Sequence, residues 1–350
     1  MDERHRRVYV FAHARSTSHL FYQLLKGHPA LQPTHALTCL PTFQLGMDSQ
    51  AALGYSKERC DAMGMNDDTI SRASWQNFVD NLQRHAIDAN PKGKRFLTMD
   101  HPYHLMSSSF VNSHVDVPGR KTWPKPSVVD HKLDVAVDEL ALECEKSEHE
   151  NEFDLRVHPN PTLIPDRFFF SFTPIFTICH LAHATPSAYR ALQEMGANTI
   201  SNLDFPVATS YRLTRLVFDS LKSYVEMRVG RRDCAASVTM PIVVDGGKLV
   251  KDPQGQVRKV CDILGLDEGG IRYNWDKPEI LMGTKMGDAF FKTLNESNGV
   301  VPNPKCDKPV DVKTEARKWA QEWDEDTAKF LRERVLESLE DYHYLLQYSV

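Results

Sequence analysis

Residues Val8–Pro29 read VYVFAHARSTSHLFYQLLKGHP. The first four are apolar, as in a parallel strand that is buried on both faces. A polar turn at 14–17 follows, and beyond it apolar residues recur at the spacing of an amphipathic helix. Gly27 stands where such a helix would end, and Pro29 lies just past it. The stretch therefore predicts a strand, a turn and a helix, which is the opening unit of an α/β fold.

The turn between this strand and helix has the features of an anion site. Three hydroxyl residues in a row, Ser16, Thr17 and Ser18, lead into the helix. The first backbone N–H groups of a helix have no partner within it, so they can bind a phosphate or a similar anion. Arg15 adds a planar, permanently charged donor that can hold an anion through two N–H groups. An ordinary strand–turn–helix with a solvated arginine is the alternative, and we favour the anion site.

Strand-like and helix-like segments alternate through the rest of the chain. We expect strands at 95–99, 174–178 and 238–244, and helices at 75–89, 211–229, 253–264, 311–323 and 326–345. This alternation predicts a three-layer α/β/α fold with a mainly parallel sheet, in one domain over 1–350. Residues 105–160 form an expected long loop insertion, with a short helix at 133–142. Such a loop is either a lid over the site or solvated surface.

Composition excludes several classes of protein. The net charge of −5 does not provide the positive field that a nucleic-acid binder needs. The seven cysteines include no C-x-x-C pair, and an odd number without a leader peptide is typical of reduced, intracellular thiols. No run of eighteen apolar residues occurs, so we expect no membrane-spanning helix. We predict a cytoplasmic protein that associates with neither membranes nor nucleic acids.

The anion-site motif also resembles a known loop. Arg15-Ser16-Thr17-Ser18, with His28-Pro29 after the helix, resembles the 5′-phosphosulfate-binding loop of the sulfotransferase superfamily, and most closely that of fungal sulfotransferase-like proteins. It is not a Walker A loop, because G-x-x-x-x-G-K-[ST] is absent from the chain. Later segments resemble the same proteins in the same order, at 160–168, 174–190, 238–266 and 281–305. The resemblance covers most of the chain and implies a sulfotransferase-like P-loop fold.

The resemblance also implies a donor site. The donor would be 3′-phosphoadenylyl sulfate (PAPS), and its product would be 3′,5′-adenosine bisphosphate. The residues that would bind it are Arg15, Ser16, Thr17, Ser18, His19 and Ser187. The late segment 281–305 would close over the nucleotide phosphates, or would be a surface loop without ligand contacts. Residues 30–72 would contribute walls to the acceptor pocket, or simply core, through Leu40, Phe43, Met47, Met63 and Met65.

A catalytic group is expected at the end of the strand at 95–99, where Met99-Asp100-His101 stands. Ligands of open α/β sheets bind beyond the carboxyl ends of the strands, so this triplet should neighbour Arg15. The resemblance implies that His101 is the general base, and an imidazole suits that role. We predict His101, Asp100 and Arg15 as catalytic residues. A structural histidine is the alternative, and a zinc site with His104 lacks a third ligand, so we predict no metal.

Two departures from the family pattern affect the donor. Met99 stands where relatives carry a lysine, and Cys179 stands where they carry an arginine that binds the 3′-phosphate. A thiol cannot replace a guanidinium for a phosphate dianion. Either another basic residue (His180, His183 or Arg190) compensates, or the usual donor is bound poorly.

Three functions follow from these observations. The first is transfer of a sulfuryl group from PAPS to a hydroxyl of a small molecule in secondary metabolism. The second is a repurposed enzyme of the same fold that no longer uses the sulfate donor and catalyses acid–base chemistry, such as a cyclisation, elimination or isomerisation. The third is an inactive binding module, which the Asp100-His101 pair disfavours. A small-molecule acceptor is the expected partner, and neither its identity nor the oligomeric state follows from the sequence.

Overall fold

The computed structural model describes residues 7–34, 66–135, 158–196, 202–230, 239–277, 280, 284–301 and 310–350. The strands are β1 (Arg7–Ala12), β2 (Leu31–Pro33), β3 (Arg95–Asp100), β4 (Thr173–Ile178) and β5 (Ile242–Asp245). The helices are α1 (Ser18–Lys26), α4 (Asp67–Arg72), α5 (Trp75–Ala89), α6 (Ser108–His114), α8 (Asp166–Phe169), α9 (Leu181–Glu194), α10 (Phe205–Thr209), α11 (Tyr211–Gly230), α12 (Gly246–Lys251), α13 (Pro253–Leu264), α14 (Lys292–Glu296), α15 (Val312–Glu322) and α16 (Glu325–Leu346). Shorter turns are the 3₁₀ segments η3 (Asn90–Lys92), η4 (Pro102–Leu105) and η6 (Glu268–Gly270), and the π-helix η7 (Gly287–Phe291).

The strands of the described residues form one parallel sheet in the order β2-β3-β1-β4-β5. β1 therefore lies at the centre, paired with β3 on one side and β4 on the other. In register, Phe11 pairs with Asp100 and Ala12 pairs with Thr177. The strand that opens the chain thus ends beside the ends of β3 and β4, and it brings the turn at 14–17 to the middle of this sheet edge.

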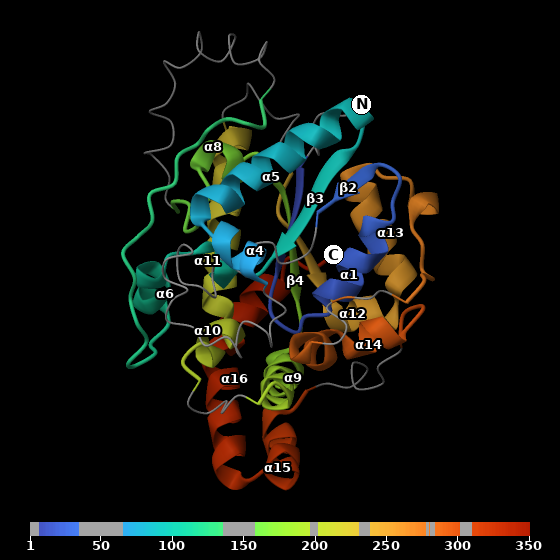
Figure 1. Cartoon of the computed structure of the whole chain (residues 1–350). Coiled ribbons are helices and arrows are strands. Elements are labelled where there is room, and N and C mark those ends of the chain that lie inside the picture. The colour runs from blue at the N-terminus through green and yellow to red at the C-terminus, as the bar shows by residue number, and fades with distance from the viewer. Residues whose placement is uncertain are drawn as a thin grey trace.

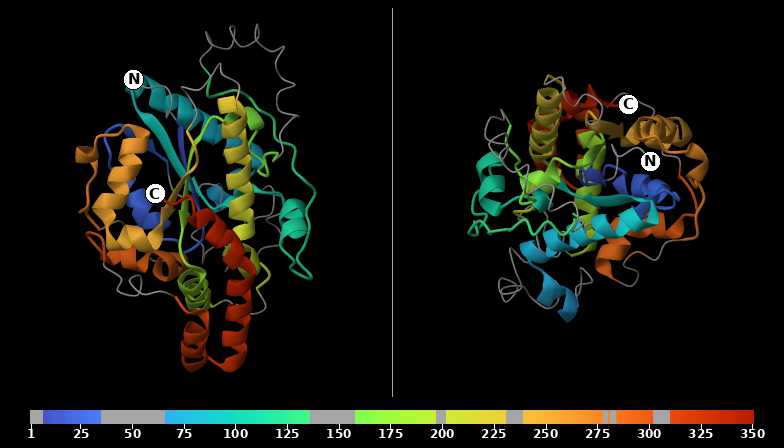
Figure 2. Two further views of the ribbon diagram at one scale, coloured as in Figure 1. Left: turned by 180° about the vertical axis from the view of Figure 1, so that it is seen from behind. Right: turned by 90° about the horizontal axis from the view of Figure 1, so that it is seen from above.

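Helices cover both faces of the sheet and make three layers (Figures 1 and 2). Alternate residues of β1 enter two separate cores: Tyr9 and Phe11 face one side, whereas Val8 and Val10 face the other. The first core is packed by α5, α8, α9, α11 and α16, and the second by α1, α12 and α13. The α/β class and the mainly parallel sheet predicted from the sequence are confirmed.

Most predicted elements are confirmed to within a few residues, and two are wrong. The last strand begins at Ile242 and not at 238, because residues 239–241 make no strand pairing. The helix predicted at 133–142 does not form in its described part, 133–135, which is a turn. Lys132 just before it has φ = 53°, a left-handed conformation that does not continue into a right-handed helix. The predicted pocket residues between 40 and 65 lie outside the described residues, as does the acidic part of the loop insertion.

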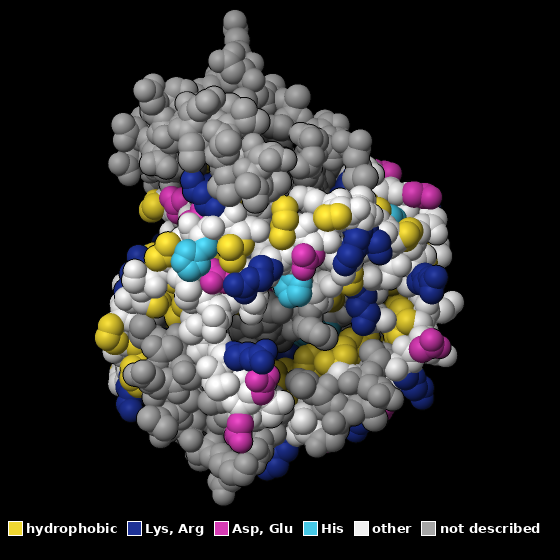
Figure 3. Space-filling model, turned by 45° about the horizontal axis from the view of Figure 1, so that its top comes forward, with side chains coloured by type: hydrophobic (Ala, Val, Ile, Leu, Met, Phe, Trp, Pro, Cys, Tyr) yellow, Lys and Arg dark blue, Asp and Glu magenta, His cyan; other side chains and the backbone are white. Residues whose placement is uncertain are grey.

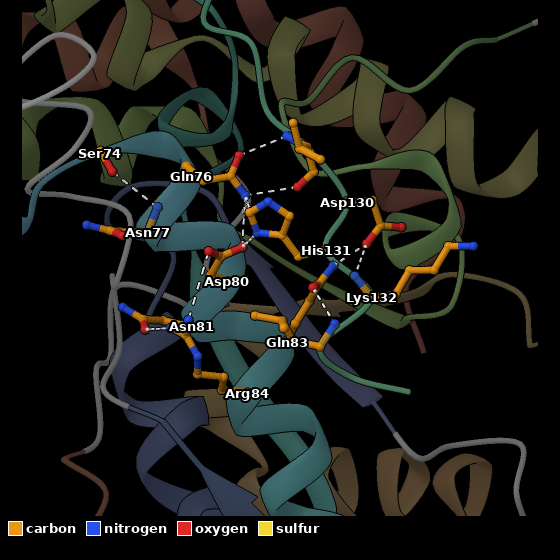
Figure 4. Close-up of polar contacts among 12 residues, drawn as sticks. Ser74, Gln76, Asn77, Asp80, Asn81, Gln83, Arg84, Asp130, His131 and Lys132 are labelled. Carbon is orange, nitrogen blue, oxygen red and sulfur yellow. Dashed lines mark hydrogen bonds and ion pairs between the residues drawn. The ribbon is translucent and has the colours of Figure 1, made fainter. Parts of the chain in front are cut away.

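Side-chain contacts hold the described end of the loop insertion against the body of the protein. Figure 4 shows Gln76 and Gln83 of α5 bonded to backbone groups of the segment 129–133. Arg167 binds the carboxylates of Asp130 and Asp134 at 2.6–3.0 Å, and Arg7 also reaches Asp134 at 2.8 Å. Burial works against ionisation of Asp130, but the bonds and charge of Arg167 outweigh it and hold the pKa of this carboxyl below its usual range. These contacts hold the segment 129–134 against α5 and α8.

Among the described residues, the surface drawn in Figure 3 shows no side chains of one kind gathered into a single patch. On the face drawn in Figure 3, basic, acidic and hydrophobic side chains are interspersed. No helix in the described part of the chain is both long enough and apolar enough to cross a bilayer.

Candidate functional site

The loop between β1 and α1 is held in an unusual backbone conformation. Arg15 (φ = 59°) and Thr17 (φ = 62°) both lie in the left-handed region, which non-glycine residues rarely occupy. Such a conformation costs on the order of 1–3 kcal/mol per residue and persists where the surroundings enforce it. The hydroxyl of Ser16 is part of that enforcement, because it donates to the carbonyl of His13 at 2.6 Å and meets the hydroxyl of Thr177 at 2.8 Å.

Helix α1 begins directly after this loop, and no side chain among the described residues caps its N-terminus. Thr17 occupies the N-cap position, and its hydroxyl donates to the carbonyl of Ser16 and does not accept from the helix. The hydroxyls of Ser16 and Thr17 are thus used within the loop. An anion at this point would meet mainly backbone N–H groups of the first turn, together with the partly positive end of the helix dipole.

Arg15 connects the loop to two elements from distant parts of the chain. Its Nε donates to the hydroxyl of Ser187 on α9 at 2.9 Å, and its Nη1 donates to the carbonyl of Phe290 at 3.2 Å. The guanidinium also lies over the Phe290 ring, 5.4 Å from its centre. Burial lowers the pKa of Arg15, and Glu194 partly opposes this. The structure thus brings together two of the residues predicted to bind the donor, Arg15 and Ser187.

His101 lies directly after β3, and the central strand fixes its orientation. Its Nδ1 is 2.6 Å from the carbonyl oxygen of Ala12, the last residue of β1. A carbonyl only accepts, so Nδ1 carries the hydrogen and Nε2 keeps a lone pair. Burial, aided by the charge of Arg15 and opposed by the hydrogen bond to Ala12, lowers the pKa of His101 to about 4. His101 is thus a neutral imidazole whose Nε2 can accept a proton.

The two residues before His101 point to opposite faces of the sheet. Asp100 is fully buried, and its carboxylate accepts a bond from the hydroxyl of Tyr9 at 3.1 Å. Met99 is equally buried and packs in the core beneath α1. The position at which the resemblance leads us to expect a lysine is therefore part of the apolar core here. Of the three, His101 has the placement expected of a proton acceptor, and Asp100 is placed to fix the end of the strand.

Other imidazoles surround His101, and the sequence had grouped only His104 with it. His104 lies 4.9 Å from the His101 ring, centre to centre. His13 stacks on Tyr211 at 3.7 Å, and its Nδ1 is 2.9 Å from the carbonyl of Ala14. Burial lowers the pKa of His13 to about 3, although the hydrogen bond to the carbonyl of Ala14 opposes this in part. The described edge of the sheet thus carries several neutral imidazoles around Arg15. Within the described residues, no group of three or more His, Cys, Asp or Glu side chains is arranged to hold a metal ion.

The predicted second phosphate position lies at the end of β4, where Cys179 stands. Cys179 is buried, and its backbone N–H and carbonyl both bond to the hydroxyl of Tyr211 at 2.8 and 2.9 Å. His180 caps α9 by accepting the N–H of Ala182 at its Nδ1. Arg190 is bound in a bidentate ion pair to Glu322 of α15. Of the residues that could have compensated for Cys179, Arg190 is therefore committed elsewhere and His180 acts as a helix cap.

The segment 284–296 covers the loop from the other side. It includes the π-helix η7, a conformation that is rare and often occurs at functional sites. It places the carbonyl and ring of Phe290 on Arg15, and the edge of the Phe291 ring against His19 at 4.5 Å. The resemblance placed a late covering segment in this part of the chain, but no local signal in the sequence predicts the π-helix.

Gly246 at the start of α12 supports the loop from below. A Cβ at this position would lie 2.5 Å from the carbonyl oxygen of Ser16 and closer still to the hydroxyl of Thr17. Only a glycine allows α12 to approach the loop so closely. The signal in the sequence is Asp245-Gly246-Gly247 directly after a strand.

We expect Gly246→Ala to displace the loop. Overpacking at such a contact costs about 1–3 kcal/mol in the free energy of unfolding, and the displaced loop should bind anions more weakly. Gly27→Ala at the far end of α1 is the matched control, because Gly27 has φ = −83° and open space around it. It should change stability by less than about 0.5 kcal/mol. Urea denaturation of both variants measures the difference, and equal stabilities would show that the close contact does not exist.

The chain is similar in sequence to curated fungal proteins. The chain is 30% identical over 193 residues to "Sulfotransferase ppzF" of Metarhizium majus (strain ARSEF 297), and 28% identical over 193 residues to the protein of the same name in Metarhizium rileyi (strain RCEF 4871). Over these residues the chain is thus similar to fungal proteins that are named sulfotransferases. Each match covers 53% of this chain and 55% of the relative, so the chain spans about half the length of the curated relatives it matches.

A solved structure aligns with most of this chain, but its structural similarity is low. The sulfotransferase domain of the Synechococcus PCC 7002 olefin synthase aligns over 91% of this chain and 94% of its own, at 15% identity and with a TM-score of 0.36. No protein-family model matches the sequence.

Proposed function

We propose that this protein is a sulfotransferase-like enzyme that moves a sulfuryl group from a phosphosulfate donor of the PAPS type to a hydroxyl of a small molecule in secondary metabolism. The observation that carries the proposal is the position of His101: its Nδ1–H is fixed on the Ala12 carbonyl, at the sheet edge where Arg15 and the uncapped N-terminus of α1 stand. The similarity to fungal proteins named sulfotransferases supports the reaction class.

The roles of the residues follow from their chemistry. His101 would take the proton of the acceptor hydroxyl at Nε2 as the oxygen bonds to sulfur. The S–O bond to the donor phosphate breaks with its electron pair, which stays on the phosphate. The residues that would hold this phosphate are Arg15 and the loop 16–19, with Ser187 steadying Arg15. Little covalent work falls to the protein, so positioning and charge stabilisation would supply most of the rate.

Donor binding tests the proposal directly. A ligand that binds only the native state stabilises it, by about 2.7 kcal/mol at a hundredfold excess over its Kd. We expect 3′,5′-adenosine bisphosphate to raise the Tm by several degrees in a thermal-shift titration. If the folded protein shows no shift at millimolar nucleotide, the phosphosulfate donor is excluded.

Two arginine variants locate the anion within the site. Arg15→Ala should weaken nucleotide binding by about 10–100-fold, because hydrogen bonds from a charged group contribute roughly 1.5–3 kcal/mol. Arg190→Ala is the control: this side chain is about as long and as charged, but it is bound to Glu322 at a part-exposed site. It should leave affinity unchanged. An effect of Arg190→Ala as large as that of Arg15→Ala would mean that the anion binds along α9 instead.

A second candidate function rests on Met99 and Cys179. Both stand where the resemblance leads us to expect cations, and both are buried. A site with His101 as a base but with fewer cations suits a repurposed enzyme that performs a cyclisation, elimination or isomerisation without the sulfate donor. Absence of nucleotide binding, together with an effect of His101 variants on a natural substrate, would favour this alternative.

A further inference from the structure

His13 stands directly after the central strand, next to the base. Ala12, the last residue of β1, and His13 are joined by a peptide unit whose N–H donates to the carbonyl of Thr177 at 3.1 Å. The carbonyl of the same peptide unit holds Nδ1 of His101 at 2.6 Å. One imidazole is thus covalently attached to this peptide unit and the other is hydrogen-bonded to it, and the charge of His101 acts on His13. A molecule bound at His101 therefore lies close to His13.

The imidazole of His13 has one nitrogen in use and one without a partner. Nδ1 is 2.9 Å from the carbonyl oxygen of Ala14, so Nδ1 carries the hydrogen and Nε2 keeps a lone pair. Nε2 is buried, and none of the residues that the structure describes donates a hydrogen bond to it. The carbonyl of Thr209 lies near the ring, but it is itself an acceptor and supplies no hydrogen. His13 is only 3% exposed, so bulk water does not solvate this lone pair.

The packing around His13 fixes this acceptor in place. Its ring stacks on that of Tyr211, with the centres 3.7 Å apart and the planes at 7°. Burial lowers the pKa of His13 to about 3, so the ring takes up no proton of its own at neutral pH. A buried acceptor without a donor is unfavourable, and the missing hydrogen has to come from a bound molecule.

His13 is separate from the contacts proposed for the donor phosphate. Arg15, two residues later, reaches Ser187 on α9 and the carbonyl of Phe290. His13 packs instead on Tyr211, the first residue of α11. The two side chains leave the end of β1 toward different elements, so the group that meets Nε2 of His13 belongs to another molecule than the phosphosulfate.

We propose that His13 contacts the acceptor molecule, and that this molecule carries a second hydrogen-bond donor, an O–H or N–H, within a few bonds of the hydroxyl that is sulfated. The inference rests on the proposed transfer reaction. The first hydroxyl gives its proton to Nε2 of His101 as its oxygen bonds to sulfur, and the electron pair of the broken S–O bond leaves with the donor phosphate. The second donor binds Nε2 of His13 and keeps its hydrogen. Diols, catechols and amino alcohols have such a pair of donors.

Pairs of acceptors that differ in a single hydrogen-bond donor test the inference. Catechol and trans-cyclohexane-1,2-diol have two hydroxyls each, whereas their monomethyl ethers keep both oxygens and lose one donor. With PAPS as sulfate donor, we expect the native protein to favour each diol over its ether by about 10–100-fold in kcat/KM, the effect of leaving one buried acceptor without its partner. Equal values for diol and ether in the native protein overturn the inference.

Two substitutions show whether the preference comes from His13. His13→Phe keeps a ring that stacks on Tyr211 but has no lone pair, and it should bring diol and ether to within about threefold of each other. His13→Gln carries an amide oxygen that can accept the same bond, and it should restore most of the preference. Both proteins should keep the native Tm within a few degrees. A preference that survives in His13→Phe arises from shape or from another residue, and it overturns the inference.

A binding measurement does not depend on sulfate transfer. In protein carrying ¹⁵N-labelled histidine, the Nε2 signal of His13 is assigned by its loss in His13→Phe or His13→Gln, and the diols and their ethers are then titrated separately. We expect the diols to move this signal and the ethers to move it much less. A signal that neither diol moves overturns the inference. If a diol moves it but no sulfated product forms with PAPS, the proposed transfer reaction fails and the contact with His13 stands.

Discussion

A His101→Ala protein should turn over its substrate about 10²–10⁴-fold more slowly than the native protein, which is the usual contribution of a positioned general base. The reason is the lone pair on Nε2, which is free because Nδ1 donates to the carbonyl of Ala12. Ligand affinity should change little, because the base does not hold the anion. Single-turnover rates at saturating substrate measure the effect apart from binding.

His101→Gln separates proton acceptance from hydrogen bonding. A glutamine amide can still donate to the Ala12 carbonyl, but it cannot accept a proton at neutral pH, so this variant should be almost as inactive as His101→Ala. Both proteins should remain folded by circular dichroism. Near-native turnover in either variant would place the base elsewhere, with His19 as the next candidate. Loss of folding in both would return His101 to a structural role.

Mild acid should destabilise this protein steeply. The pKa values of His13 and His19 are lowered by burial to about 3, and that of His101 to about 4, from 6.5 in the unfolded chain. Between pH 6.5 and about 4 the unfolded state therefore binds more protons than the folded state. The stability that these neutral imidazoles contribute is fully present above pH 6.5. As the pH drops below that value, the free energy of unfolding falls by about 1.4 kcal/mol per pH unit for each group.

Because three such groups titrate over the same range, a fall of a few pH units should remove most of a free energy of unfolding of about 5–15 kcal/mol, the usual range for a native protein. Urea denaturation at pH 8, 7, 6 and 5 measures the dependence. His101→Gln removes one titrating group, so its stability should fall less steeply below pH 6.5 than that of the native protein. A stability that is constant from pH 8 to pH 5 would show that these imidazoles are not buried as described.

The sequence was most informative where the signal was local. The apolar run of β1, the turn and α1 follow from residues 8–29, and the pairing of β1 with β3 places His101 beside the loop, as expected from parallel strand ends. The catalytic and donor-binding roles of these residues stay predictions. Arg15, Ser187 and His101 are together at the sheet edge because the order of the strands puts them there.

The features that were missed are those that depend on contacts between distant segments. Phe290 reaches Arg15 across 275 residues of sequence, and Gly246 meets the loop from the start of α12. His13 stacks on Tyr211, which begins a helix almost two hundred residues later. Neither periodicity nor a local motif records which distant residue will approach a loop, so a single sequence gives no signal for these contacts.

The bond between His101 and Ala12 also bears on how this site can change over generations. The group that orients the imidazole is a main-chain carbonyl, which every amino acid possesses, so no exchange of a partner side chain can remove it. That carbonyl belongs to the central strand, flanked by β3 and β4. Substitutions of the surrounding residues could alter which molecules enter the site, or whether a sulfate donor is used at all, while the imidazole of His101 keeps its orientation. Such a scaffold can lose one chemistry and acquire another without rebuilding its base.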